Sequence, residues 1–310
     1  MKYSSFHWLA TRVFGMLLTV LGISLTVFAL LYVIPGDPVE ALVGEQATPA
    51  DRDALRHALA LDLPVRAQLG RYYRHLLSFD FGNSLATQQP IAEILPARWW
   101  ATLQLAAAAM ALAVVLAVPL GMLAARYEHR AWDRFSAGYA MFGSALPNFV
   151  IGPVLIIIFA VWLGWVPIAG ADTRGSIVLP AVTLSIGLSA VLARQLRAAL
   201  LVVLTEDYLR AAAARGLSPA AVLLRHALPN AALTLLTLIG MQFGGLLGGT
   251  VITETIFGWP GLGALTVEAI SRRDYPMVQA CVLCISATYV LLNALTDLLY
   301  AWCDPRVARA

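Results

Sequence analysis

TEDYLRAAAARGLSPAAVLLRHALPN, residues 205–230, is a charged segment that lies between two long apolar runs. The whole chain is 60% apolar and 13% charged, whereas a soluble domain carries about 25% charged residues. This composition indicates an integral membrane protein. Because the two apolar runs hold the charged segment beside the membrane, it is a candidate surface for recognition by another protein.

Six apolar runs are long enough to cross the hydrocarbon layer, which takes roughly 20 helical residues. They are residues 13–34, 101–125, 135–165, 177–203, 231–252 and 280–302. The first run is longer than the core of a signal peptide, and no cleavage site follows it promptly, so we expect it to be retained. The sequence therefore predicts an all-α integral membrane protein with six transmembrane helices.

The third run has 31 residues, which is too long for one straight crossing at about 1.5 Å per residue. Pro147 and Pro153 predict a break inside it. We therefore expect a kinked helix over about 139–165. Two short crossings are the alternative, but no polar turn separates the two halves.

The lysine and arginine residues of short loops set the orientation of membrane helices. With the N-terminus inside, the cytoplasmic segments carry 12 of them, namely Lys2, Arg12, Arg126, Arg130, Arg134, Arg194, Arg197, Arg210, Arg215, Arg225, Arg306 and Arg309. The short outer loops carry three, namely Arg174, Arg272 and Arg273. Both termini and the segment 205–230 are therefore predicted to be cytoplasmic.

The runs divide the chain into four parts. These are an N-terminal transmembrane helix (1–35), an extracytoplasmic loop with short helices (36–100), a core of five transmembrane helices that includes the cytoplasmic loop 205–230 (101–303), and a cytoplasmic tail (304–310).

Two short helices are expected in the extracytoplasmic loop. Thr48 followed by Pro49 is typical of a helix start, with the hydroxyl as N-cap and proline in the first turn. Residues 64–77 form the second helix. The loop is either a solvated cap over the outer surface or a docking lip for a soluble partner.

The chain lacks the residues for hydrolysing ATP. Its only lysine is Lys2, whereas a P-loop needs a lysine on the phosphates after a glycine-rich stretch. We therefore predict no catalytic residue, and any ATP hydrolysis would take place on another chain. The net charge of +3 is spread along the sequence without a basic patch, so no nucleic acid binding is expected.

Metal and proton chemistry are also disfavoured. The five histidines have no ligand spacing, and Cys281 and Cys284 lie inside the last apolar run, where such residues are usually small apolar side chains. An ion-coupled carrier normally places ionisable groups inside its spans. Here Arg194 and Arg197 lie near a cytoplasmic end, where they can snorkel, and Asp297 lies near another. No metal site and no proton relay are predicted.

Two glycine-rich features mark the fifth run and the loop after it. Gly240, Gly244 and Gly248 recur every four residues, which lets helix backbones approach closely in lipid. The partner is either a helix of this chain or a second membrane subunit. Trp259, Pro260 and Gly261 are typical of a turn, which is either an outer gate or a plain interfacial loop.

The sequences YLRAAAARG at 208–216 and HALPN at 226–230 resemble the cytoplasmic EAA loop of the membrane subunits of binding-protein-dependent ABC importers. That family pattern is E-A-A, three residues, G, nine residues, I-x-L-P. Here Arg210 stands in place of the acid, Ala211 and Ala212 match the alanines, Gly216 matches the glycine, His226 stands in place of isoleucine, and Leu228 and Pro229 match the end.

Further stretches are similar to the dipeptide, oligopeptide and nickel branch of this family. They are IPGDP at 34–38, ALPNF at 145–149, ETIFGWPGLG at 254–263, RDYP at 273–276 and DPR at 304–306. The resemblance covers nearly the whole chain. It implies a type I ABC importer permease fold, in the bacterial inner membrane.

The resemblance also implies partners and roles. These partners are a second homologous permease subunit, two cytoplasmic ATPase subunits that bind ATP and Mg, an extracytoplasmic substrate-binding protein and the lipid bilayer; this chain would bind no cofactor. Residues from Glu206 to about Leu217 would form a coupling helix in a cleft of the ATPase, and Gly216 would end it. From composition alone, the same stretch could be an amphipathic helix on the membrane, with Arg210 and Arg215 facing headgroups.

The candidate residues are as follows. ATPase coupling is predicted for Glu206, Asp207, Tyr208, Arg210, Ala211, Ala212, Arg215, Gly216 and Leu217; a pathway or gate for Pro147, Asn148, Gln242, Glu254, Trp259, Pro260 and Gly261; and subunit packing for Gly240, Gly244 and Gly248. The leading hypothesis is ATP-driven import of short peptides. Import of nickel or a metal chelate is the alternative in the same branch, and an ATP-independent carrier or channel is the alternative of another class.

Overall fold

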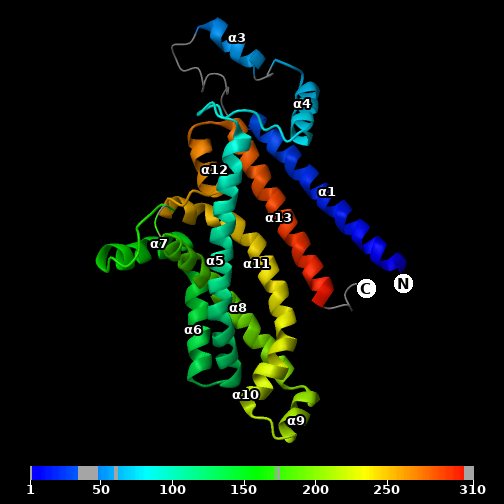
Figure 1. Cartoon of the computed structure of the whole chain (residues 1–310), viewed down its shortest axis with the longest axis vertical. Coiled ribbons are helices and arrows are strands. Elements are labelled where there is room, and N and C mark those ends of the chain that lie inside the picture. Colours follow the sequence, from blue (N-terminus) through cyan, green and yellow to red (C-terminus); the bar gives the residue numbers. More distant parts are fainter. Residues whose placement is uncertain (1, 34–47, 59–61, 172, 174, 304–310) are drawn as a thin grey trace.

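The computed structural model describes residues 2–33, 48–58, 62–171, 173 and 175–303. Helices are the regular structure of this part of the chain (Figure 1). They are α1 (Lys2–Val33), α3 (Pro49–Ala58), α4 (Val65–Leu77), α5 (Ile91–Arg126), α6 (Ala131–Ala145), α7 (Asn148–Leu155), η1 (Ile156–Trp162), α8 (Val178–Leu204), α9 (Asp207–Ala214), α10 (Pro219–Ala221), η2 (Val222–Ala227), α11 (Leu228–Phe257), α12 (Leu262–Ser271) and α13 (Tyr275–Cys303). The predicted cytoplasmic tail lies outside the described residues.

The apolar runs become the long helices of the bundle. Within the described residues, α5, α8, the stretch Pro219–Phe257 and α13 are long and apolar enough to cross a membrane, and the bent pair of α6 with α7 and η1 makes a fifth. The first predicted span lies in α1, whose described apolar part, Val13–Ala29, is shorter. The all-α membrane fold is confirmed.

The third run is not the kinked helix that we expected over 139–165. Helix α6 ends at Ala145, and the pair of α7 and η1 leaves it at an angle of 102°. Proline disfavours helical geometry in the residue before it. Leu146 is accordingly extended, with ψ 117°, and Pro147 becomes the N-cap of α7. The break at Pro147 is therefore confirmed, but it is a right-angled turn, whereas Pro153 stays inside α7.

Helix α5 is longer than its apolar run. It starts at Ile91, ten residues before the expected position 101, with Pro90 as N-cap and Glu93 in the first turn. An acid in the first turn favours a helix start because it faces the positive end of the helix dipole. The indole of Trp99 donates a hydrogen bond to Thr288 Oγ1 at 2.8 Å, which ties this extension to α13.

The centre of the bundle is the contact between α5 and α8. Small residues of α5 lie at spacings of three and four, and they are fully buried: Ala106, Ala109, Ala113 and Ala117. Leu192, Leu196 and Leu200 of α8 belong to the same buried core. Since lipid gives helices no hydrophobic reason to associate, such small residues favour packing by letting backbones come close.

Arg197 does not reach out to the membrane surface as expected. Its Nε donates to Asp133 Oδ1 at 2.6 Å and its Nη2 donates to Asp133 Oδ2 at 2.9 Å. This two-point pairing has the geometry in which guanidinium and carboxylate bind most strongly. It fastens the N-terminal end of α6 to the cytoplasmic half of α8.

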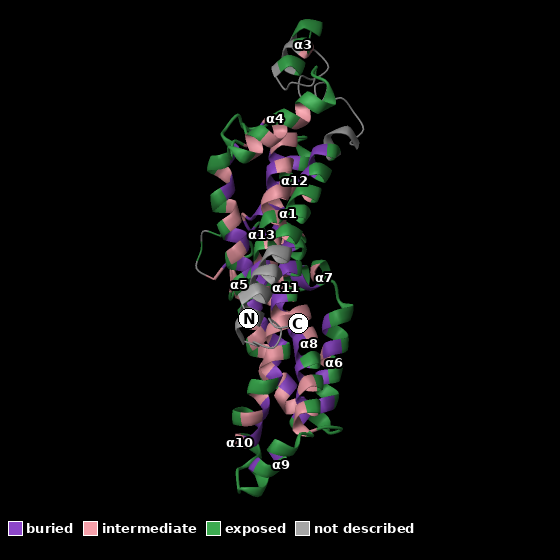
Figure 2. Cartoon of the chain, turned by 90° about the vertical axis from the view of Figure 1, so that its right-hand side faces the viewer, coloured by how far each residue is buried: buried purple, intermediate pink, exposed green. Residues whose placement is uncertain are grey.

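The two ends of the molecule carry different elements. In Figure 1, α9 and α10 lie at one end, and α3 and α4 lie at the other, beyond α12. Figure 2 shows buried residues along the middle of the bundle and mainly exposed residues in α3 and α9. The two helices predicted after Thr48 and over 64–77 are confirmed as α3 and α4.

Helix α1 lies against the last helix, α13, and against α4. The amide of Gln279 donates to the carbonyl of Val27 at 3.3 Å. The hydroxyls of Ser24 and Tyr73 share a hydrogen bond at 3.0 Å. The first span is thus held by the last span and by the extracytoplasmic loop.

Candidate functional site

The predicted coupling segment folds as a short helix that ends at a glycine. Glu206 has an extended backbone and caps α9, and Asp207 in the first turn accepts a hydrogen bond from Arg210 at 3.2 Å. Gly216 has φ +87°, a left-handed conformation that glycine adopts without strain. Its amide donates to Ala213 at 2.9 Å. The predicted helix is confirmed over Asp207–Ala214, which is shorter than the expected 206–217, and Gly216 lies in the turn that follows it.

One face of α9 is fixed to the rest of the chain. Leu209 is 3% exposed and Ala212 is 1% exposed, and both belong to the central apolar core. The amide of Asn230, in the first turn of α11, donates to the Tyr208 hydroxyl at 2.8 Å. Helix α9 is therefore bonded to α11 and packs against η2.

The other face of α9 is open. Arg210 and Ala211 are exposed on it, and Arg215 and Leu217 are exposed in the turn that follows α9. Tyr208 is exposed as well, and its hydroxyl bonds to Asn230. Ala212, which we expected to touch a partner, faces inward. This is because positions 209 and 212 are three apart and so lie on one side of the helix. The open face carries the remaining predicted coupling residues.

A buried carboxylate at the far end of α11 joins three helices. Glu254 is 0% exposed. Its Oε1 accepts a hydrogen bond from Thr102 of α5 at 2.7 Å, and its Oε2 accepts one from the amide of Ala264 in α12 at 3.0 Å. Thr102 Oγ1 in turn accepts from the amide of Leu262 at 2.8 Å. We call Thr102, Glu254 and the amides of Leu262 and Ala264 the Glu254 cluster.

The residues around the Glu254 cluster explain the glycine-rich turn. A Cβ on Gly261 would overlap the carboxylate of Glu254, and one on Gly263 would lie 2.6 Å from the backbone of Val251. The indole of Trp259 donates to the carbonyl of Ala101 at 2.9 Å and fixes the ring against α5. The turn thus fixes the position of α12 relative to α11.

The structure brings together only some of the predicted pathway residues. Glu254, Trp259 and Gly261 share the joint, with Pro260 between them. Pro147 and Asn148 lie at the bend between α6 and α7, and Gln242 lies half-buried in the middle of α11. Thr102 was missed, because a threonine in an apolar run gives no sign of its distant partner.

A second joint links the RDYP stretch, residues 273–276, to the end of the extracytoplasmic loop. Asp274, which is buried, accepts hydrogen bonds from Ser84 Oγ and from the amide of Ala86 at 3.3 Å. Its other oxygen accepts from the amide of Met277 at 3.3 Å. The RDYP stretch therefore caps α13 and also holds the end of the extracytoplasmic loop.

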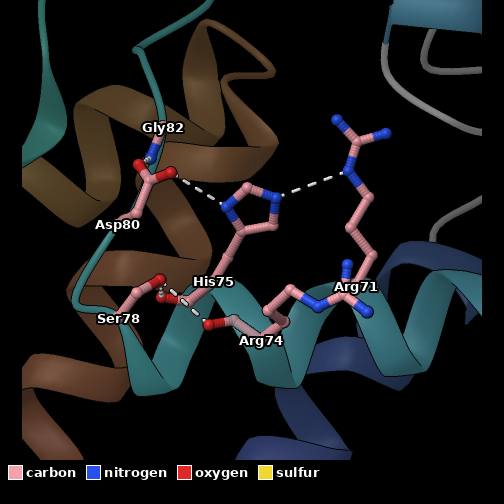
Figure 3. Close-up of polar contacts among 6 residues, drawn as sticks. All are labelled: Arg71, Arg74, His75, Ser78, Asp80 and Gly82. Atoms are coloured by element: carbon pink, nitrogen blue, oxygen red, sulfur yellow. Dashed lines mark hydrogen bonds and ion pairs between the residues drawn. The ribbon is translucent and has the colours of Figure 1, made fainter.

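The end of α4 carries a polar group on the extracytoplasmic face (Figure 3). Arg71 Nε donates to Nε2 of His75 at 3.4 Å, so Nδ1 of His75 carries the proton that faces Asp80 at 2.9 Å. The amide of Gly82 and then the ring of His75 hold the pKa of Asp80 below its ordinary value. These side chains are exposed, so the loop remains compatible with both a cap and a docking lip.

The three predicted packing glycines do not share one role. A Cβ on Gly240 would overlap Thr296 of α13, and one on Gly244 would lie 3.0 Å from the Tyr289 ring of α13. Both therefore pack against a helix of this chain, which is one of the two alternatives that the sequence left open. Gly248 has nothing within 4 Å of a Cβ position, so packing on another subunit stays a prediction for it.

The same substitution, glycine to valine, should therefore have different effects at Gly240 and at Gly248. Gly240→Val should destabilise the chain by about 1–3 kcal/mol, because overpacking forces α11 and α13 apart. Gly248→Val should leave the thermal stability of the isolated chain in detergent unchanged. Equal melting temperatures for the two variants would contradict this assignment.

The described residues include no group of three or more His, Cys, Asp or Glu placed to hold a metal ion. The described part of the chain is therefore a helical bundle with a charged helix at one end and a buried carboxylate at the other. Comparison with known proteins identifies what such a chain belongs to.

The profile described as "Binding-protein-dependent transport system inner membrane component" matches residues 117–309, and that of its N-terminal part matches 5–106. The chain belongs to this family. It is a multi-pass permease subunit of an ABC importer in the bacterial inner membrane, and separate ATPase subunits hydrolyse the ATP. It is not itself an enzyme.

Relatives of this permease match over the full length. The chain is 38% identical over 301 residues to the glutathione transport system permease protein GsiC of Salmonella paratyphi A, covering 97% of this chain and 98% of that protein. The identity and coverage are the same for GsiC of Escherichia coli strain K12.

Solved structures share the fold of the permease. Inward-facing MetNI, a methionine ABC transporter, matches with a TM-score of 0.57 at 18% identity, covering 66% of this chain and 94% of that one. An amino acid ABC transporter with histidines matches with a TM-score of 0.50 at 18% identity, covering 68% and 92%. The predicted type I permease fold is confirmed.

Proposed function

We propose that this permease subunit carries short peptides across the inner membrane, together with a second, homologous permease subunit. Two cytoplasmic ATPase subunits would bind ATP and Mg, and an extracytoplasmic binding protein would deliver the peptide. The observation that carries the substrate class is the full-length match to permeases named for glutathione transport, since glutathione is itself a small peptide.

The coupling role of α9 is supported by its surroundings. Arg210 and Ala211 on its open face, with Arg215 and Leu217 just after it, are free to enter a cleft of an ATPase, while Leu209 and Ala212 anchor the opposite face in the core. The helical stretch Pro219–Phe257 has 39 residues, which at 1.5 Å per residue spans roughly 58 Å. It connects the coupling segment with the Glu254 cluster at the opposite end.

This connection gives a mechanism for alternating access. Closure of the ATPase pair on ATP would move α9, and the Asn230 and Tyr208 contact would pass the movement to α11. At the outer end, the Glu254 carboxylate would carry α12 along and pull on α5 through Thr102. Nucleotide would thus bias a rigid-body change between two arrangements of the helices.

Import of nickel or a metal chelate is the second candidate. It rests on the motifs of the branch, and the described residues offer no metal-binding group of their own. A chelate would therefore be recognised by the binding protein. An ATP-independent carrier is set aside by the family to which the chain belongs.

Reconstitution tests the proposal. Proteoliposomes that hold both permeases and both ATPases, with the binding protein added outside, should take up a labelled short peptide only when ATP is inside. Uptake by this chain alone, or uptake that persists without ATP, would contradict the ATP-driven function. Mass spectrometry of the ligand retained by the purified binding protein would distinguish a peptide from a metal chelate.

A further inference from the structure

A cavity of about 680 Å³ lies between α5, residues 171, 173 and 175–177, α11 and α13. This volume is in the range of small-molecule sites. Gln104 is 13 residues from the start of α5, and Phe243 is 14 residues from the end of α11, so each lies roughly 20 Å along its helix. The cavity therefore extends from the outer residues 171, 173 and 175–177 and from Trp259 into the bundle as far as Gln104 and Phe243.

Three aromatic side chains contribute to the walls of the cavity. The rings of Trp100, Phe243 and Trp259 line it. Trp259 is held in place by its hydrogen bond to Ala101, next to the Glu254 cluster. The joint between α11 and α12 thus forms one wall of the cavity, and a movement of that joint would change the shape of the cavity.

Polar groups in the cavity are few and uncharged. The amide of Gln104 is exposed and makes no side-chain hydrogen bond within the described part of the chain. Thr173 and Ser176 also line the cavity, and their hydroxyls share a hydrogen bond at 2.8 Å. An unpaired amide is costly in hydrocarbon, and Gln104 lies inside the predicted span 101–125, so the cavity is better suited to water or a polar ligand than to lipid.

We propose that this cavity is a contact site for the peptide in transit and that Gln104 hydrogen-bonds the peptide backbone. This inference rests on the proposed function. The described lining residues include no Asp, Glu, Lys, Arg or His, so the site would not hold a bare metal ion or the charged ends of a peptide. The carbonyl of the Gln104 amide can accept a hydrogen bond from a peptide N–H, while the aromatic rings contact apolar side chains.

Uptake by the complete reconstituted importer tests the role of Gln104. The variant Gln104→Leu should lower ATP-driven uptake of a tripeptide by about three- to tenfold, as expected for the loss of one hydrogen bond. The same variant should lower uptake of the tripeptide with N-methylated backbone amides by a smaller factor, because that peptide cannot donate the hydrogen bond. Gln195→Leu, an exposed glutamine of α8 outside the cavity, is the matched control and should leave both rates unchanged.

Three results would overturn the inference. They are wild-type uptake in Gln104→Leu, an equal loss for both peptides, and an equal loss in Gln195→Leu. A labelling experiment separates this failure from failure of the proposed function. In a chain without its native cysteines, Gln104→Cys should react with a water-soluble maleimide, and bound tripeptide should slow the reaction. Absence of labelling would place the residue in lipid and reject the site, whereas a wild-type importer that takes up no peptide would reject the function.

Discussion

Gly216→Leu should reduce ATP-driven uptake by roughly tenfold and weaken the association of the permease with its ATPases. A residue other than glycine pays roughly 1–2 kcal/mol in the left-handed conformation that Gly216 adopts, and 1.4 kcal/mol is a tenfold change in population. Nothing lies within 4 Å of a Cβ at this position, so the backbone conformation causes the loss and steric overlap does not. Uptake in proteoliposomes and co-purification of the ATPases measure the effect.

Two control variants distinguish this cause from others. Gly216→Asn should keep most of the activity, because asparagine tolerates the left-handed region better than other side chains. Gly70→Leu, in α4 at the other end of the molecule, also has open space around its Cβ, and it should leave ATPase co-purification unchanged. Normal assembly and normal uptake in Gly216→Leu would contradict a coupling role for α9.

Glu254→Ala should destabilise the chain by about 3 kcal/mol or more and abolish tight closure of the outer side. The change leaves the Ala264 amide and the Thr102 hydroxyl without their acceptor in a buried place, and each such group costs about 1–3 kcal/mol. It also removes the hydrogen bond that joins α12 to α11. Thermal unfolding in detergent measures the first effect, and leakage of a small solute from proteoliposomes measures the second.

Matched variants keep this prediction specific. Glu254→Gln preserves the volume and one acceptor oxygen, so its effects should be intermediate. Thr255→Ala changes the next residue, which is exposed and bonds only to Val251 in its own helix, so it should behave as wild type. If Glu254→Ala were as stable and as tightly closed as Thr255→Ala, the Glu254 cluster would have no role in the gate.

Much of the fold could be predicted because membrane helices are determined by residues that are close together in the sequence. The length of an apolar run is set by the thickness of the bilayer, and the arginine distribution sets the orientation. The coupling helix could also be predicted, since its alanines favour a helix and Gly216 ends it. These features depend on residues that are neighbours along the chain.

The missed features depend on direction in space. Pro147 predicts that a helix is interrupted there, but not that the next helix leaves at 102°. Residues spaced by four also do not stay on one face, because 3.6 residues make a turn. Between Gly240 and Gly248 the direction rotates by roughly 80°, so the first faces α13 and the last faces open space.

The candidate site was predictable in its residues but not in its pairing. Glu254 and Trp259 were named from the turn and from the family resemblance. The partner of Glu254 is Thr102, which is 152 positions away and stands among apolar residues. A single sequence offers no local signal for a contact of that range.

The contact between the first and last helices has a consequence for how the protein is made. Val27 of α1 accepts its hydrogen bond from Gln279 of α13, 252 residues later. At roughly 5–20 residues per second, a ribosome needs on the order of tens of seconds to cover that distance. Helix α1 is therefore synthesised first but can reach its final place only among the last, once α13 has entered the bilayer.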